Sequence, residues 1–179
     1  NEKYLNIERG FFIELGANDG ITQSNTLYLE LKRNWRGILI EPQPQKYLEC
    51  VQNRNQENIF ECCACVDFKF TDKFVEIIYA DLMSVSASLP LELSSIDEHL
   101  EKAKTLQAGK NFGFSFGAKA KTLNAVLEFH NSPKVVDFLS LDVEGAEMAV
   151  LNGIDFNKYK FRVMLVEARN IKSLEKFLN

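Results

Sequence analysis

The chain has 179 residues, the size of a single domain with one buried core. Hydrophobic residues make up 46% of it and charged residues 26%, as in ordinary soluble globular proteins. The formal net charge of −4 argues against a nucleic-acid backbone as the main partner, because such binding needs clustered Lys and Arg. No apolar run approaches the length of a membrane-spanning helix.

Strands alternate with helices along most of the chain. Short apolar runs predict strands over 11–15, 37–41, 59–66, 135–141 and 161–167. Apolar residues at helical spacing predict helices over 25–34, 44–54, 122–131, 145–152 and 171–178. This alternation predicts an α/β fold with a mostly parallel sheet and helices on both faces. In such a sheet the ligand crevice lies at the carboxyl ends of the strands.

The middle of the chain, near 68–121, interrupts the alternation and is expected to be an insertion within one domain spanning 1–179. Residues 68–79 predict a β-hairpin that turns at 71–73, and a helix is expected over 93–107. The Ser-rich loop 84–88 and the segment 112–116 are candidates for a lid, because long loops in enzymes often shape the substrate pocket.

The most informative motif follows the first strand. Glu14 lies near the strand end, and a turn runs from Gly16 to Gly20 with Asn18 between the two glycines. Glycine lets the backbone approach a ligand closely, and the next helix offers unpaired N–H groups. Asn18 replaces the second glycine of the dinucleotide fingerprint, which disfavours pyrophosphate binding. Asn18 either contacts the ligand or serves as a turn residue that tolerates a left-handed backbone.

Further acids follow the ends of other predicted strands. Glu41 lies about 20 residues beyond the glycine turn, the spacing at which an acid meets ribose hydroxyls, although Glu41 could instead be solvated. Asp67 either binds an adenine amino group or begins the hairpin. Asp142 ends the strand 135–141, and Glu144 and Glu147 follow near a helix start, where the helix dipole stabilises acids.

Three of these segments together resemble the FkbM family of S-adenosylmethionine (SAM)-dependent methyltransferases. The first family motif resembles residues 14–20, Glu41 corresponds to the ribose-binding acid, and the D-x-E-G-x-E signature matches residues 142–147. The resemblance covers roughly residues 11 to 170. It implies a Rossmann-like class I methyltransferase fold. Such a fold usually has two more strands after the fifth, whereas only the helix 171–178 follows the strand 161–167 here. Either the sheet is trimmed or its C-terminal part lies outside this segment.

The resemblance also implies a cofactor, an acceptor and a set of site residues. SAM is the expected cofactor, and the acceptor is expected to be a small molecule or glycan whose hydroxyl is methylated. The residues expected to bind the cofactor are Glu14, Gly16, Asn18, Gly20, Glu41, Asp67 and Asp142. An alcohol acceptor benefits from a general base. Asp142 is the first candidate for this base, and Glu144 and His130 follow it.

The four cysteines are Cys50, Cys62, Cys63 and Cys65. Cys62 and Cys65 have the C-x-x-C spacing, but there is no second such pair and no nearby histidine to complete a zinc site. No metal site is therefore predicted, and reduced core thiols in a cytoplasmic protein are favoured. Two alternatives to a methyltransferase remain open. One is a nucleotide-dependent oxidoreductase, and the other is a non-catalytic SAM-binding or interaction module with a methyltransferase fold.

Overall fold

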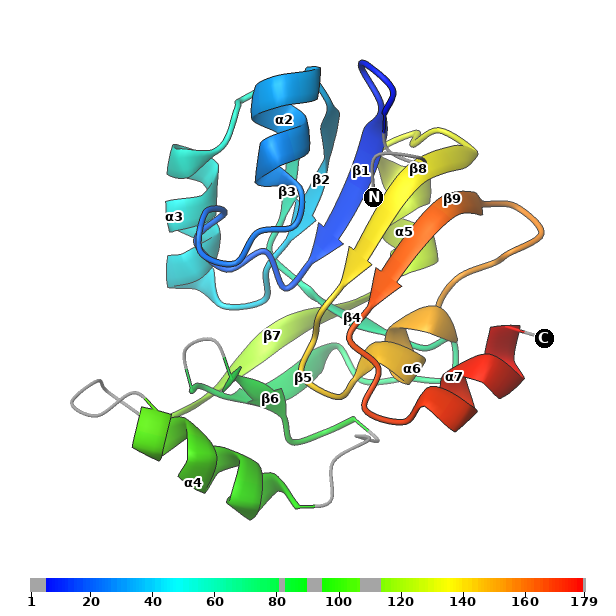
Figure 1. Ribbon diagram of the computed structural model, residues 1–179. Helices are drawn as coiled ribbons and strands as arrows, with labels where there is room; N and C mark the ends of the chain where they lie inside the picture. Colours follow the sequence, from blue (N-terminus) through cyan, green and yellow to red (C-terminus); the bar gives the residue numbers. More distant parts are fainter. Residues whose placement is uncertain (1–5, 81–82, 90–94, 107–113, 179) are drawn as a thin grey trace.

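A computed structural model describes residues 6–80, 83–89, 95–106 and 114–178 of this protein. These residues form two sheets, and the second lies at the carboxyl ends of the strands of the first (Figure 1). The first sheet has five strands in the order β3-β2-β1-β8-β9, and every neighbouring pair is parallel. Its strands are β1 (Phe11–Leu15), β2 (Arg36–Ile40), β3 (Ile59–Glu61), β8 (Val135–Leu141) and β9 (Lys160–Val166). The predicted parallel sheet is therefore confirmed.

Helices cover both faces of this sheet, as the alternation predicted. They are α2 (Leu27–Arg33), α3 (Pro44–Asn53), α5 (Leu123–Phe129), α6 (Glu147–Leu151) and α7 (Ile171–Leu178). One face of the sheet, with Ile13 and Leu139, packs against Leu127 of α5 and Leu151 of α6. The side chain of Phe12 points to the opposite face, because successive strand residues alternate. There it packs with the residues of a second cluster that includes Leu29, Trp35 and Cys50.

The second sheet lies at the carboxyl end of the first and was only partly predicted (Figure 1). Its strands are β4 (Ala64–Val66), β5 (Phe74–Ile78), β6 (Val85–Ser86) and β7 (Ser115–Thr122), in the order β4-β7-β5-β6. The predicted single strand 59–66 is wrong, because the chain leaves the first sheet after β3 and enters the second sheet at β4.

The predicted hairpin 68–79 is also wrong. The side chain of Asp67 accepts hydrogen bonds from the backbone N–H groups of Lys69 and Phe70, both at 2.8 Å, so the chain turns there and forms no first hairpin strand. β5 pairs antiparallel with β7 and β6 instead. Helix α4 (Ile96–Leu106) lies next to this sheet, and positions 93, 94 and 107 of the predicted helix fall outside the described residues.

Within the described part of the chain, the parallel sheet ends at β9 and helix α7 follows it. The described residues include no helix that is both long and apolar enough to cross a membrane.

Candidate functional site

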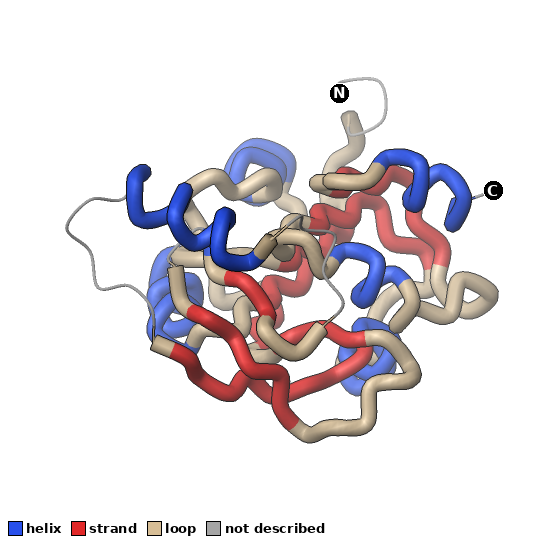
Figure 2. Tube along the Cα trace, turned by 90° about the horizontal axis from the view of Figure 1, so that it is seen from below, coloured by secondary structure: helices blue, strands red, loops and turns tan. Residues whose placement is uncertain are grey.

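A cavity of about 520 Å³ lies between the carboxyl end of the parallel sheet and the second sheet. This volume falls in the usual range for sites that bind small molecules. Seen from below, the second sheet lies in front of the parallel one and forms the cavity's other wall (Figure 2). The crevice therefore lies at the strand ends, where the α/β alternation predicted it.

The glycine turn after β1 forms one edge of the cavity. Gly16 has a φ of +77°, and a Cβ there would lie 1.9 Å from the carbonyl oxygen of Asp142. Only glycine therefore fits where the loops after β1 and β8 meet. Gly20 also has a positive φ, but it packs on Arg54 and Cys50 and is not among the lining residues. Gly20 therefore lies outside the cavity, and its positive φ shapes the turn.

Asn18 combines the two roles that the sequence left open. Its φ is +47°, so it does occupy the left-handed region. Its side chain also lines the cavity, and its Oδ1 is buried without a hydrogen-bond partner among the described residues. A buried acceptor of this kind costs free energy until a donor reaches it. Asn18 is therefore suited to bind a ligand N–H or O–H group.

Glu14 lines the cavity, but its carboxylate serves the protein. Its oxygens accept hydrogen bonds from the Ser24 hydroxyl at 3.0 Å, the Asn25 N–H at 2.8 Å and the Thr26 hydroxyl at 2.5 Å. Arg54 Nη1 adds a fourth donor at 3.3 Å. These donors fill the roughly four lone-pair sites of a carboxylate. Glu14 therefore anchors the loop after β1, and its predicted contact with a cofactor stays a prediction.

Arg54 is the centre of a buried charge network that the sequence did not reveal. Its side chain is fully buried, and its guanidinium pairs with both Glu14 and Glu30, the latter at 2.9 Å. It also donates to the carbonyl oxygen of Gly20 at 3.1 Å. The carboxylate of Glu30 accepts further hydrogen bonds from Asn58 and Asn55. Nothing in the local sequence distinguishes Arg54 from an exposed cation at a helix end.

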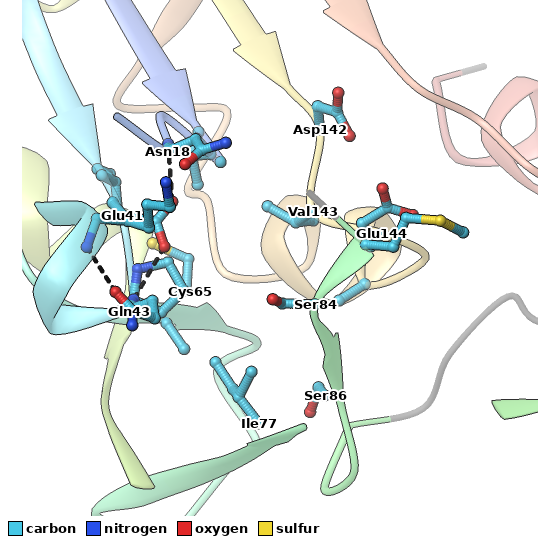
Figure 3. Close-up of a pocket in the computed structure, with 18 of the residues that line it drawn as sticks. Asn18, Glu41, Gln43, Cys65, Ile77, Ser84, Ser86, Asp142, Val143 and Glu144 are labelled. Atoms are coloured by element: carbon cyan, nitrogen blue, oxygen red, sulfur yellow. Dashed lines mark hydrogen bonds between the residues drawn. The ribbon is translucent and has the colours of Figure 1, made fainter. Parts of the chain in front are cut away.

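Glu41 lies at the end of β2 and faces the cavity (Figure 3). One oxygen accepts the N–H of Asn18 and the other the N–H of Gln43, each at 2.9 Å. Burial raises the pKa of Glu41 to about 7, although the two N–H donors and Lys46 oppose this shift. Because a carboxylate has roughly four lone-pair sites, two remain for the hydroxyls of a ligand.

Asp142 and Glu144 lie across the cavity from Glu41 (Figure 3), and a third acid, Glu167, also lines the cavity. Oxygens of Asp142, Glu144 and Glu167 lie within 4.8 Å of one another. Burial, and after it the neighbouring carboxyl group of Glu167, raise the pKa of Asp142 to about 7. Burial likewise raises the pKa of Glu144 to about 7, opposed by Arg169. Carboxylates at this spacing attract a cation, and the guanidinium of Arg169 supplies one by pairing with Glu144.

Glu144 contacts two other parts of the chain at this side of the cavity, Arg169 after β9 and His99 of α4. Its φ is +55°, unusual for a residue other than glycine. His99 of α4 lies 3.7 Å from its carboxylate and also 2.9 Å from the carbonyl oxygen of Met83. Glu147 is buried, and its Oε1 accepts the N–H groups of Val143 and Gly145. Glu147 therefore holds the loop after β8 in place and does not line the cavity.

Two predicted site residues lie outside the cavity. His130 Nε2 lies 2.6 Å from Glu61 Oε1, and Lys121 pairs with the other oxygen of Glu61 at the same distance. This cluster connects β3, β7 and the end of α5, so His130 is removed from the candidates for the base. Asp67 caps its own turn and does not line the cavity either, which favours its structural alternative.

The second sheet contributes a wall that the sequence did not predict. The apolar lining residues from this region are Val75, Ile77, Tyr79, Met83, Leu89 and Phe116. Ser84 and Ser86 of the predicted lid loop line the same part of the cavity. Residues 112 and 113 of the other predicted lid segment lie outside the described residues, and Phe116 is part of β7. Alternating burial along β5 is typical of a strand. The pairing of β5 with β7, however, joins residues that are far apart in the sequence, so the sequence did not predict this wall.

Comparison with known proteins gives one match. A family model described as the methyltransferase FkbM domain matches residues 14–178. No curated protein and no solved structure matches the chain. The family match includes the glycine turn, Glu41 and the D-x-E-G-x-E segment, and it covers nearly the whole chain. The chain therefore belongs to the FkbM methyltransferase family, whose domain is Rossmann-like.

Proposed function

We propose that this methyltransferase uses SAM to methylate a hydroxyl group of a sugar or natural product. The observation that carries the proposal is that the glycine turn, Glu41 and the acid cluster around Asp142 all line one cavity. A cofactor and an acceptor could both be held there, because the apolar wall of the second sheet provides a further surface opposite the strand ends.

The lining residues fit SAM in three places. Glu41 has lone pairs free for the ribose hydroxyls, since backbone N–H groups occupy only two of its sites. Asn18 Oδ1 offers a buried acceptor for the ammonium group of the amino-acid end. Ala64 and Cys65 line the part of the cavity expected for adenine. When bound, SAM supplies an electrophilic methyl group on a sulfonium whose leaving group is a neutral thioether.

The protein's own contribution is alignment and removal of a proton. Alignment of the two reactants contributes about 7–11 kcal/mol in favourable cases. Asp142 is the proposed general base, because it lies at the cavity end of β8. A positioned base accelerates a reaction by about 10²–10⁴, most effectively when its pKa lies near the working pH. The pKa of Asp142, raised to about 7 by burial, meets this condition.

Hydroxyl-rich acceptors suit this end of the cavity. Asp142, Glu144 and Glu167 all carry oxygens that accept hydrogen bonds from hydroxyl groups. The apolar side chains of the second sheet favour an acceptor that also presents an apolar face, as a sugar ring or a polyketide does. The free thiols of all four cysteines support the proposal of a cytoplasmic enzyme, since reducing compartments keep thiols unpaired.

The direct test is methyl transfer from SAM that carries a labelled methyl group to a panel of sugars and hydroxylated natural products. The proposal predicts a labelled methyl ether on at least one acceptor and no transfer by the Asp142→Asn variant beyond a small residual rate. Stable SAM binding without transfer to any hydroxyl would favour the non-catalytic alternative.

A further inference from the structure

Glu167 lies beside Asp142 because of the strand register. Leu141 of β8 pairs with Val166 of β9, so Asp142 and Glu167 are the next residues on two neighbouring parallel strands. The N–H of Glu167 donates to the carbonyl oxygen of Leu141 at 2.9 Å, and the N–H of Asp142 donates to that of Leu15 at 3.3 Å. These bonds fix the backbone at both positions, and both side chains line the cavity.

An oxygen of Asp142 lies within 4.8 Å of an oxygen of Glu167. Two negative charges this close at a largely buried site repel each other, so the arrangement favours a proton on one of the two carboxyl groups. Such a proton belongs to the pair, and the pair titrates as a unit. The contact is thus a place where the protein can store one proton at the cavity wall.

The other charged groups nearby have different partners. Glu144 is paired with Arg169 and lies near His99 of α4, so its charge is compensated. Glu147 accepts two backbone N–H groups from its own loop. The charges of Glu144 and Glu147 also raise the pKa of Asp142, but they do so less than Glu167 does. Among the described acids, Glu167 is the one that follows the neighbouring strand next to Asp142 and raises its pKa most.

We propose that Glu167 is a positioning residue for methyl transfer, which receives a hydrogen bond from Asp142 once Asp142 has taken the proton of the acceptor hydroxyl. This inference rests on the proposed function. Above the midpoint of the pair both carboxylates are ionised before the reaction, and this is the active form. The acceptor oxygen forms its bond to the methyl carbon while the carbon–sulfur bond breaks, and the electron pair of that bond remains on sulfur. The hydroxyl proton moves to Asp142, is shared with Glu167, and leaves to solvent after product release.

The first test needs neither cofactor nor acceptor. The carboxyl carbon of Asp142, assigned with Asp142→Asn, is titrated by carbon-13 NMR in the wild type and in Glu167→Gln. The wild-type midpoint is expected at about 7. Loss of the shared proton should lower it by at least about one pH unit in Glu167→Gln. Glu144→Gln, which removes a charge from the same cavity but leaves the pair intact, should lower it less.

The second test is the pH dependence of methyl transfer. The wild-type rate should rise with pH through the midpoint of the pair, because only the ionised pair can accept a proton. In Glu167→Gln this rise should move to lower pH and the plateau should fall by about 10-fold or more, within the range of general-base effects. Glu167→Asp should recover part of the wild-type profile. A purely structural role would lower the rate equally at all pH values.

Equal Asp142 midpoints in the wild type and Glu167→Gln would overturn the proposal, and so would an unchanged pH–rate profile. A larger midpoint shift in Glu144→Gln would overturn it as well. Calorimetry with SAM on the wild type separates this outcome from failure of the proposed function. If the wild type does not bind SAM, the proposed function fails whatever Glu167 does, and the NMR titration still decides whether the pair exists.

Discussion

Arg54 Nη1 lies 3.3 Å from Glu14 Oε2, and both side chains are buried behind the loop that follows β1. The guanidinium also pairs with Glu30 and donates to the carbonyl oxygen of Gly20, so one cation holds α2, the glycine turn and the end of β1 together. The shape of the cavity edge at Gly16 and Asn18 therefore depends on a residue outside the cavity.

The first prediction concerns this buried cation. Arg54→Met should lower the free energy of unfolding by about 3–5 kcal/mol, because it leaves buried carboxylates without their partner. Urea denaturation of the wild type and the variant measures the change. Arg36→Met provides the matched control, since Arg36 pairs with Glu57 at an exposed site, where such a pair contributes about 0–1 kcal/mol. Equal effects of the two substitutions would contradict the network's structural role.

The second prediction concerns ribose recognition. Glu41→Ala should weaken SAM binding by about 1.5–3 kcal/mol, because hydrogen bonds to a charged group are lost. Calorimetry measures the affinity, and melting curves report the effect of losing the acceptor for Asn18 and Gln43. Asp67→Asn is the control, since Asp67 follows β4 but lies outside the cavity and should leave the affinity unchanged. Unchanged affinity in Glu41→Ala would place ribose elsewhere.

The third prediction concerns pH. Burial raises the pKa of Glu41 in the folded protein to about 7, above its ordinary value of 4.5. The folded state therefore binds the proton more tightly than the unfolded state does, and this contribution to stability is lost as pH rises from about 4.5 to about 7. As the pH rises through this window, the melting temperature of the wild type should accordingly fall relative to that of Glu41→Gln. A constant difference would show that the pKa of Glu41 is not raised in the folded protein.

The fourth prediction compares two of the three candidate bases from the sequence, Asp142 and His130. Asp142→Asn should lower methyl transfer by about 10²–10⁴. His130→Asn should leave the rate within about twofold of the wild type, since His130 is bonded to Glu61 outside the cavity. Single-turnover methylation with both variants measures the effect on chemistry. A large loss in His130→Asn with normal folding would return His130 to the site.

The parallel sheet and the acids at its strand ends were predictable because their signals are local. Glu41 and Asp142 each directly follow a short apolar strand, and parallel strands bring such positions to one edge. The division of 59–66 was not predictable, since Cys62 and Cys63 continue an apolar run that is typical of one strand. The role of Arg54 and the pairing of β5 with β7 also escaped prediction, because both depend on residues distant in the sequence.

The most direct measurement of the central claim is calorimetric titration of the protein with SAM, its demethylated product and NAD. The account predicts saturable binding of SAM and of the product, with weaker affinity in Glu41→Ala and unchanged affinity in Asp67→Asn. Clear binding of NAD without binding of SAM would contradict the account and favour the nucleotide-dependent oxidoreductase.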